Sequence, residues 1–116
     1  MKITVAVPSY VYRIMTQCLK ENESLDSIVQ YCLGRSYFVR GDHFLEIFKT
    51  AAKGIDPKDT KTFEVEIDDV CQKICEEIAK GIVPDSITPS FEEKAQVIIT
   101  ISCKSFVDCI KQKTND

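Results

Sequence analysis

The sequence predicts one small α+β domain with about three strands and five helices. Its 116 residues fit a single domain, because one hydrophobic core suffices at that length. The hydrophobic fraction of 44% and the charged fraction of 28% are ordinary for a globular chain. Three segments have the pattern of strands, and each runs directly into a segment with helical periodicity. We therefore expect residues 1–116 to fold as one unit.

The first 40 residues predict a strand followed by two helices. Apolar and polar side chains alternate over Lys2–Val7, as in a strand with one buried face. After Pro8, apolar residues recur every three or four positions, so we expect a helix over residues 9–20. Ser24 is placed to cap a second helix, and Gly34 is placed to end it.

Residues 41–116 predict an extension with the order helix, strand, helix, strand, helix. A wide apolar stripe follows Asp42, which predicts a helix that ends at Gly54. Apolar and acidic side chains alternate over residues 62–67, so this strand should show its acidic side to water. Asp68 is placed to cap the helix that follows.

The last strand and helix are predicted from a nearly continuous apolar run. We expect Gly81 to end the preceding helix and residues 82–90 to form a loop. The run over residues 96–101 then predicts a central strand covered on both faces. Ser102 is placed to cap the final helix.

Strand-to-capped-helix junctions occur three times in the chain. They lie at Val7-Pro8-Ser9, Ile67-Asp68-Asp69 and Ile101-Ser102-Cys103. A duplicated unit would explain the recurrence, although such junctions are also common without duplication.

The charge balance offers no general attraction to nucleic acid or to anionic membranes. The formal net charge is −3 and the pI is about 5.2. Residues 1–40 carry five basic and three acidic residues, whereas the other 76 carry ten basic and fifteen acidic ones. No apolar run approaches the roughly 20 residues that span a bilayer, and the N-terminus lacks the pattern of a secretory signal. We expect a cytoplasmic protein without membrane contact.

We predict no catalytic residue, no metal and no cofactor. His43 is the single histidine, which excludes a histidine-rich metal site. Cys71 and Cys75 are spaced to share a zinc ion, but they also lie on the apolar face of their helix, where packing explains them. An alternative hypothesis makes one of these two thiols a nucleophile, stabilised by Lys73 or Lys80.

The first 35 residues resemble the ribbon-helix-helix family of dimeric DNA-binding repressors. The resemblance rests on Lys2–Pro8, the helix and short polar turn after it, and Ser24–Val29. In that family two strands from different subunits pair and lie in the major groove of DNA. The resemblance therefore implies a non-enzymatic transcription regulator that binds double-stranded DNA as a homodimer. It assigns base contacts and one phosphate contact to four positions: Lys2, Thr4, Ala6 and Ser24.

Two alternatives remain open at this point. The strand Lys2–Val7 pairs either with a second copy or, inside the chain, with residues 63–67 or 97–101. The alternative function is an acidic protein-binding adaptor or inhibitor, encoded by a virus or mobile element. Such a protein would dock on a basic partner through Glu64 and Glu66.

Overall fold

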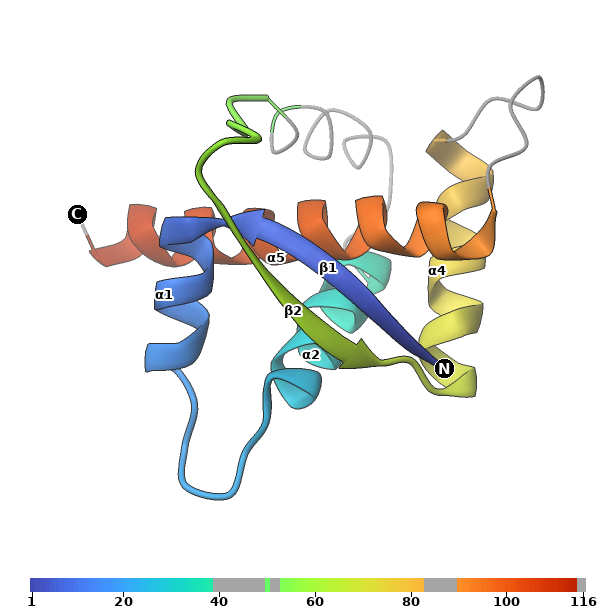
Figure 1. Cartoon of the computed structure of the whole chain (residues 1–116), viewed down its shortest axis with the longest axis horizontal. Helices are drawn as coiled ribbons and strands as arrows, with labels where there is room; N and C mark the ends of the chain where they lie inside the picture. The colour runs from blue at the N-terminus through green and yellow to red at the C-terminus, as the bar shows by residue number, and fades with distance from the viewer. Residues whose placement is uncertain (39–49, 51–52, 83–89, 115–116) are drawn as a thin grey trace.

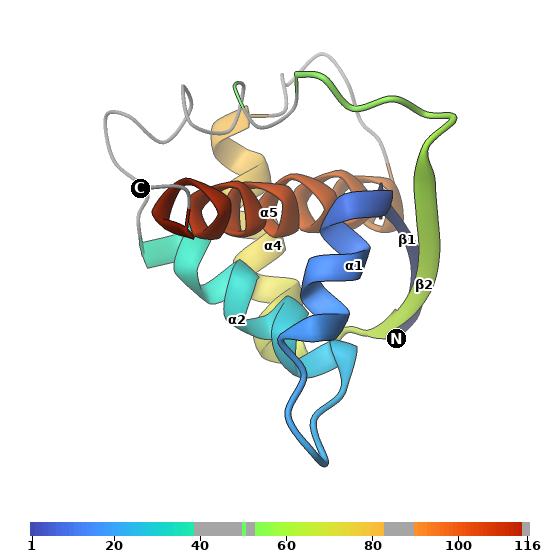
Figure 2. The ribbon, with the colours of Figure 1, turned by 90° about the vertical axis from the view of Figure 1, so that its left-hand side faces the viewer.

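We describe the fold from a computed structural model, in which residues 1–38, 50, 53–82 and 90–114 are described. In this part of the chain, two strands form a ribbon and four helices pack behind it (Figure 1). Figure 2 shows the same two layers from the side, with the strands at the right and the helices at the left. The elements in order are β1 (Lys2–Pro8), α1 (Ser9–Gln17), α2 (Leu25–Phe38), β2 (Thr60–Glu66), α4 (Asp69–Ile82) and α5 (Phe91–Thr114).

The predicted α+β class is confirmed, and the ribbon forms within one chain. β1 and β2 pair antiparallel, from Lys2 opposite Glu66 to Pro8 opposite Thr60. The alternation predicted for both strands is present, because β1 buries every second side chain and β2 buries Val65. β1 therefore pairs with the strand at residues 60–66 of the same chain.

Helix α1 and the turn after it agree with the sequence, whereas the end of α2 does not. Val11 and Met15 of α1 are fully buried against the ribbon. Asn22 in the turn has a φ of 73°, a left-handed conformation that asparagine tolerates better than most residues. Gly34 was expected to end α2, but the helix continues to Phe38. The buried Leu33 beside it outweighs the modest helix penalty of one glycine.

Helix α4 begins as predicted. The backbone N–H of Cys71 donates to Asp68 Oδ1 at 2.8 Å, so Asp68 is the cap of this helix. Cys71, Cys75 and Ile78 of the predicted apolar face are buried, whereas Val70 is 64% exposed. The helix continues to Ile82, past the end predicted at Gly81. The predicted helix after Asp42 and the loop over residues 83–89 lie mostly outside the described residues, as does His43.

The strand predicted over residues 96–101 is wrong, because this segment lies inside the 24-residue helix α5. Ser90 starts that helix, since its Oγ accepts a hydrogen bond from Glu93 N–H at 3.2 Å. Val97 is 54% exposed, whereas the buried residues of this segment recur at the spacing of a helical face. The apolar run is therefore one helical face plus an exposed valine. These buried residues are Ala95, Ile98, Ile99, Ile101, Ser102 and Cys103.

Ser102 is consequently not a cap. It lies in the middle of α5 and is 1% exposed. Its hydroxyl has no hydrogen-bond partner among the residues that the structure describes.

Within the described residues, the elements repeat the order strand, helix, helix. β1, α1 and α2 form the first unit, and β2, α4 and α5 form the second. The register pairs Thr4 with Glu64, which lies sixty positions later and is the equivalent residue of the second unit. A local two-fold axis therefore passes between these two residues. The equivalent inward residues are Ile3 and Phe63, Val5 and Val65, Val7 and Ile67, Val11 and Cys71, and Met15 and Cys75.

The second helices of the two units also correspond. Ser24 and Ser90 each directly precede one of these helices. The residues five, eight and nine positions further on are buried in both: Val29 and Ala95, Cys32 and Ile98, Leu33 and Ile99. Two of the three junctions seen in the sequence thus join the strand to the first helix of a unit, and the third lies inside a helix.

Substitutions at Ser90 and Ser102 test where α5 begins. We expect Ser90→Ala to lower the free energy of unfolding by about 1 kcal/mol, because it removes a helix cap. We expect Ser102→Ala to leave that free energy unchanged or to raise it, because it removes a buried hydroxyl without a partner. Urea denaturation followed by circular dichroism measures both changes. A loss of about 1 kcal/mol or more for Ser102→Ala would contradict the continuous helix.

Candidate functional site

The ribbon has one face turned away from the helices, which we call the outward face. Because strand side chains alternate, the even-numbered residues of both strands share this face. Its six central side chains are all exposed: Lys2, Thr4, Ala6, Thr62, Glu64 and Glu66. Five of these residues were predicted from the sequence to be contact residues, and the structure places them on one surface. Thr62 lies on the same surface.

The outward face is weakly acidic. It carries one lysine and two glutamates, with Lys2 opposite Glu66 and Thr4 opposite Glu64. Glu66 also pairs with the amino group of Met1 at 3.0 Å, but this exposed pair contributes little. Within the described residues, Glu64 has no ion-pair partner. Its carboxylate therefore remains available to a cation from another molecule.

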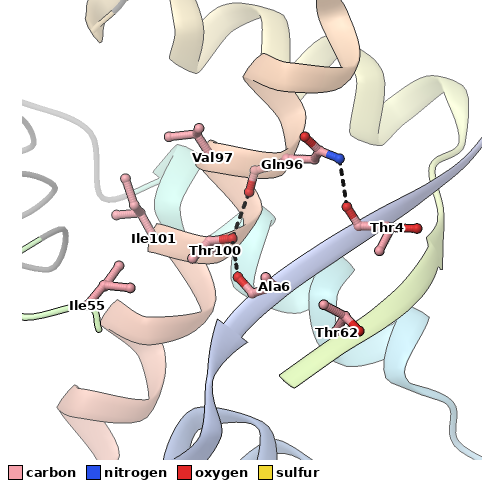
Figure 3. Close-up of a pocket in the computed structure, with 8 residues that line it drawn as sticks. All are labelled: Thr4, Ala6, Ile55, Thr62, Gln96, Val97, Thr100 and Ile101. Atoms are coloured by element: carbon pink, nitrogen blue, oxygen red, sulfur yellow. Dashed lines mark hydrogen bonds between the residues drawn. The ribbon is translucent and has the colours of Figure 1, made fainter. Parts of the chain in front are cut away.

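Side chains of α5 cover the outer edge of β1. Gln96 Nε2 donates to the carbonyl of Thr4 at 2.9 Å, and Thr100 Oγ1 donates to the carbonyl of Ala6 at 2.7 Å (Figure 3). The two donors lie four positions apart, so they project from one side of the helix. This edge of β1 is therefore occupied by its own chain.

A groove of about 500 Å³ lies where α5 meets the outward face. Figure 3 shows Thr4 and Ala6 from β1 and Thr62 from β2 on one side, and the apolar side chains of Val97 and Ile101 on the other. Ile55 adds a third apolar side chain. The groove presents apolar side chains next to the hydroxyl groups of Thr4 and Thr62. The glutamates of β2 lie outside the groove on the same outward face.

The first turn of α2 meets the ribbon at the end where Lys2 pairs with Glu66. Asp26 Oδ1 accepts the backbone N–H of Glu66 at 3.1 Å. Ser24, which precedes this turn, is exposed, and its carbonyl accepts the N–H of Ser27 at 3.1 Å. The predicted phosphate position at Ser24 thus lies two residues from Asp26, whose carboxylate repels a phosphate.

The thiols of α4 are poorly suited to nucleophilic chemistry. Burial is the main cause that raises the pKa of Cys71 to about 11, and the Asp68 carboxylate adds to the effect. Burial likewise raises the pKa of Cys75 to about 12. Lys73 and Lys80 are exposed, and Lys80 pairs with Glu77 at 3.0 Å. Both thiols are therefore protonated at neutral pH, which opposes the nucleophile hypothesis.

No metal site is found in the described part of the chain. It contains no group of three or more histidine, cysteine, aspartate or glutamate side chains arranged to hold an ion. Among these residues, Cys71 and Cys75 have no further ligands of the kind that structural zinc requires.

A partly buried polar cluster joins α1 to α5. Asp108 accepts hydrogen bonds from Tyr10 Oη at 2.6 Å and from Lys104 Nζ at 2.8 Å. Lys104 is buried, and Lys111 Nζ lies 4.7 Å from the ring centroid of Tyr10. Burial, together with the Asp108 carboxylate, raises the pKa of Tyr10 above its ordinary value. Tyr10 is therefore protonated at neutral pH, and we assign the cluster to stability.

The groove was not predicted from the sequence, because residues 96–101 were predicted to form a strand. Gln96 and Thr100 contact β1 only because they lie one helical turn apart on α5. The helix-forming run Glu92–Gln96 after Ser90 was the signal that favoured a helix.

The six cysteines should differ sharply in reactivity. Cys18 is exposed, whereas Cys32, Cys71, Cys75 and Cys103 are buried. We expect an alkylating reagent at about pH 8 to modify Cys18 first and the four buried thiols only on unfolding, because the reagent needs an accessible thiolate. Mass spectrometry of timed samples identifies the modified positions. Rapid modification of Cys71 in the folded protein would instead support the hypothesis that this thiol is a nucleophile.

The polar cluster predicts a loss of stability at alkaline pH. The pKa of Tyr10 is higher in the folded state than the unfolded value of about 10. Its contribution to stability is therefore complete below about pH 10 and declines as the pH rises further. We expect Tyr10→Phe to destabilise the protein at pH 8, with a penalty that shrinks above about pH 10. Urea titrations of both proteins across this range measure the difference, and a penalty independent of pH would contradict the linkage.

Comparison with protein-family models, with curated proteins and with solved structures found no match. None of the helices in the described residues combines the length and the apolar content needed to cross a membrane.

Proposed function

We propose that the protein is a non-catalytic binding module that docks a basic segment of another protein on its outward face. Glu64 and Glu66 are the charged contacts in this proposal. The observation that carries it is the exposed carboxylate of Glu64 on an open strand, without an ion-pair partner among the described residues.

Charge complementarity supports a basic partner. The outward face has two carboxylates and one lysine, and the adjoining start of α2 adds Asp26. Complementary charges accelerate encounter and select among partners, more than they supply affinity. The acidic balance of the whole chain acts in the same direction.

The groove supports a partner that also carries an apolar side chain. Val97 is 54% exposed, and with Ile55 and Ile101 it forms apolar surface beside Thr4 and Thr62. Interfaces gain most of their binding energy from a few buried anchors, whereas exposed charges at the rim contribute less. A basic segment with one apolar anchor would use both parts of the site.

DNA binding is the second candidate, and the ribbon itself favours it. Two strand-helix-helix units give an antiparallel ribbon in one chain, with Lys2, Thr4 and Thr62 facing outward. A single chain would then do what the resembled family does with two subunits. We rank this candidate lower because α5 flanks the outward face along β1, and because Asp26 lies beside the predicted phosphate position while Glu64 and Glu66 lie on the outward face.

Binding assays with two kinds of ligand separate the candidates. We expect short random peptides selected on the immobilised protein to be enriched in lysine and arginine. Fluorescence anisotropy should then show binding that weakens between about 0.05 M and about 0.5 M NaCl. Glu64→Lys should reduce the affinity about tenfold or more, because it reverses the charge at the contact.

Glu76→Lys is the matched control. It makes the same change of charge on the exposed side of α4, so it should leave peptide affinity unchanged. Duplex DNA is titrated in parallel. Salt-sensitive DNA binding that is lost on Lys2→Glu, with no selected basic peptides, would replace the protein-binding proposal by the DNA-binding one.

A further inference from the structure

We propose that the basic partner binds as an extended strand added to the free edge of β2, so that it becomes the third strand of the sheet. This inference rests on the proposed function and specifies how the partner engages the acidic strand. In such strand addition, backbone hydrogen bonds supply affinity and alternate side chains supply specificity.

The register shows which backbone groups of β2 are free. The N–H of Ile67 donates to the carbonyl of Met1 at 2.7 Å, and the N–H of Ser9 donates to the carbonyl of Asp59 at 3.1 Å. In an antiparallel pair the residues that bond across the ladder alternate with residues that point away. The odd-numbered residues of β2 therefore bond to β1. The N–H and C=O groups of Thr62 and Glu64 point away from it.

These outward backbone groups have no partner within the described ranges. No hydrogen bond reaches the backbone of Thr62 or Glu64 from the side away from β1, and the side chains of both residues are exposed. Figure 2 shows β2 as the nearer strand of the ribbon, with β1 behind it. Unpaired strand edges of this kind are templates for another strand.

Three other backbone groups along the ribbon edges already have partners. On β1, the carbonyls of Thr4 and Ala6 already accept hydrogen bonds from α5. On β2, Asp26 accepts the N–H of Glu66 and so covers the last residue of the strand. The part of the β2 edge that remains free is therefore Thr60–Glu64. It includes Glu64, the first of the two glutamates on the outward face.

The charges select a basic strand over a second copy of this chain. If the β2 strands of two copies paired at this edge, their acidic rows would lie side by side on one face, which is unfavourable. A peptide with lysine or arginine at every second position instead places cations beside Glu64 and Glu66. The occupant we infer is thus an extended basic segment of a partner protein.

A proline substitution tests the edge without breaking the ribbon. The N–H of Thr62 points outward, so Thr62→Pro removes a donor that the β1–β2 ladder does not use. β1 shows that the ribbon tolerates proline at such a position, because Pro8 is also even-numbered and lies opposite Thr60. Thr62→Ala is the matched control, since it shortens the side chain and keeps the N–H.

The experiment uses the full chain and a synthetic peptide of alternating lysine and valine. Thr62→Pro should weaken binding about tenfold or more relative to Thr62→Ala, a comparison that separates the loss of the N–H from the effect of the shortened side chain. The same peptide with N-methyl groups on alternate backbone nitrogens should bind about tenfold more weakly, which tests the hydrogen bonds without altering the protein. Amide hydrogen exchange should show new protection at Thr62 and Glu64, while Phe63 and Val65 are protected already.

Three outcomes decide between the proposals. Loss of affinity with proline and with the N-methylated peptide supports strand addition. Binding that depends on Glu64 but ignores both backbone changes overturns strand addition and leaves a side-chain contact on the outward face. Absence of binding by the basic peptides overturns both this inference and the proposed function.

Discussion

The pairing of β1 with β2 is the interaction on which the rest of the molecule depends. It joins segments far apart in the sequence, as the contact between Met1 and Ile67 shows, so the chain must close a long loop before the ribbon exists. The buried face of the ribbon then receives Val11 and Met15 of α1 and the apolar side of α5. The outward face, the groove and the free edge are all defined by this one register. Without it, the acidic residues would lie on an isolated strand and share no surface.

The repeated order of elements does not make the two edges of the ribbon equivalent. The second helix of each unit approaches the strand of the other unit, but α5 reaches two carbonyls of β1 through Gln96 and Thr100. In the described part of the chain, the hydrogen bond between helix α2 and β2 is the one that Asp26 accepts. Its residue equivalent to Thr100 is Gly34, which has no side chain to donate. Thr100 thus helps to cover the edge of β1, whereas Gly34 offers no side chain to cover the edge of β2.

Local sequence patterns correctly predicted the strands and helices that bury only one of their faces. Alternation fixed which residues of β1 and β2 face outward, so Lys2, Thr4 and Glu64 were placed correctly on exposed positions. The cap at Asp68 followed from its residue type and position. Residues 96–101 were misassigned because a short apolar run fits a buried strand and a buried helix equally well. The groove could not be predicted, since it depends on how α5 crosses β1 in three dimensions.

The local two-fold axis has a further consequence for how the outward face can vary. In a ribbon built from two identical subunits, every substitution appears on both sides of the axis. Here Thr4 and Glu64 are equivalent positions encoded separately, and they already differ in charge. Each side of the surface is therefore free to acquire its own chemistry, and the ligand that fits it need have no symmetry of its own.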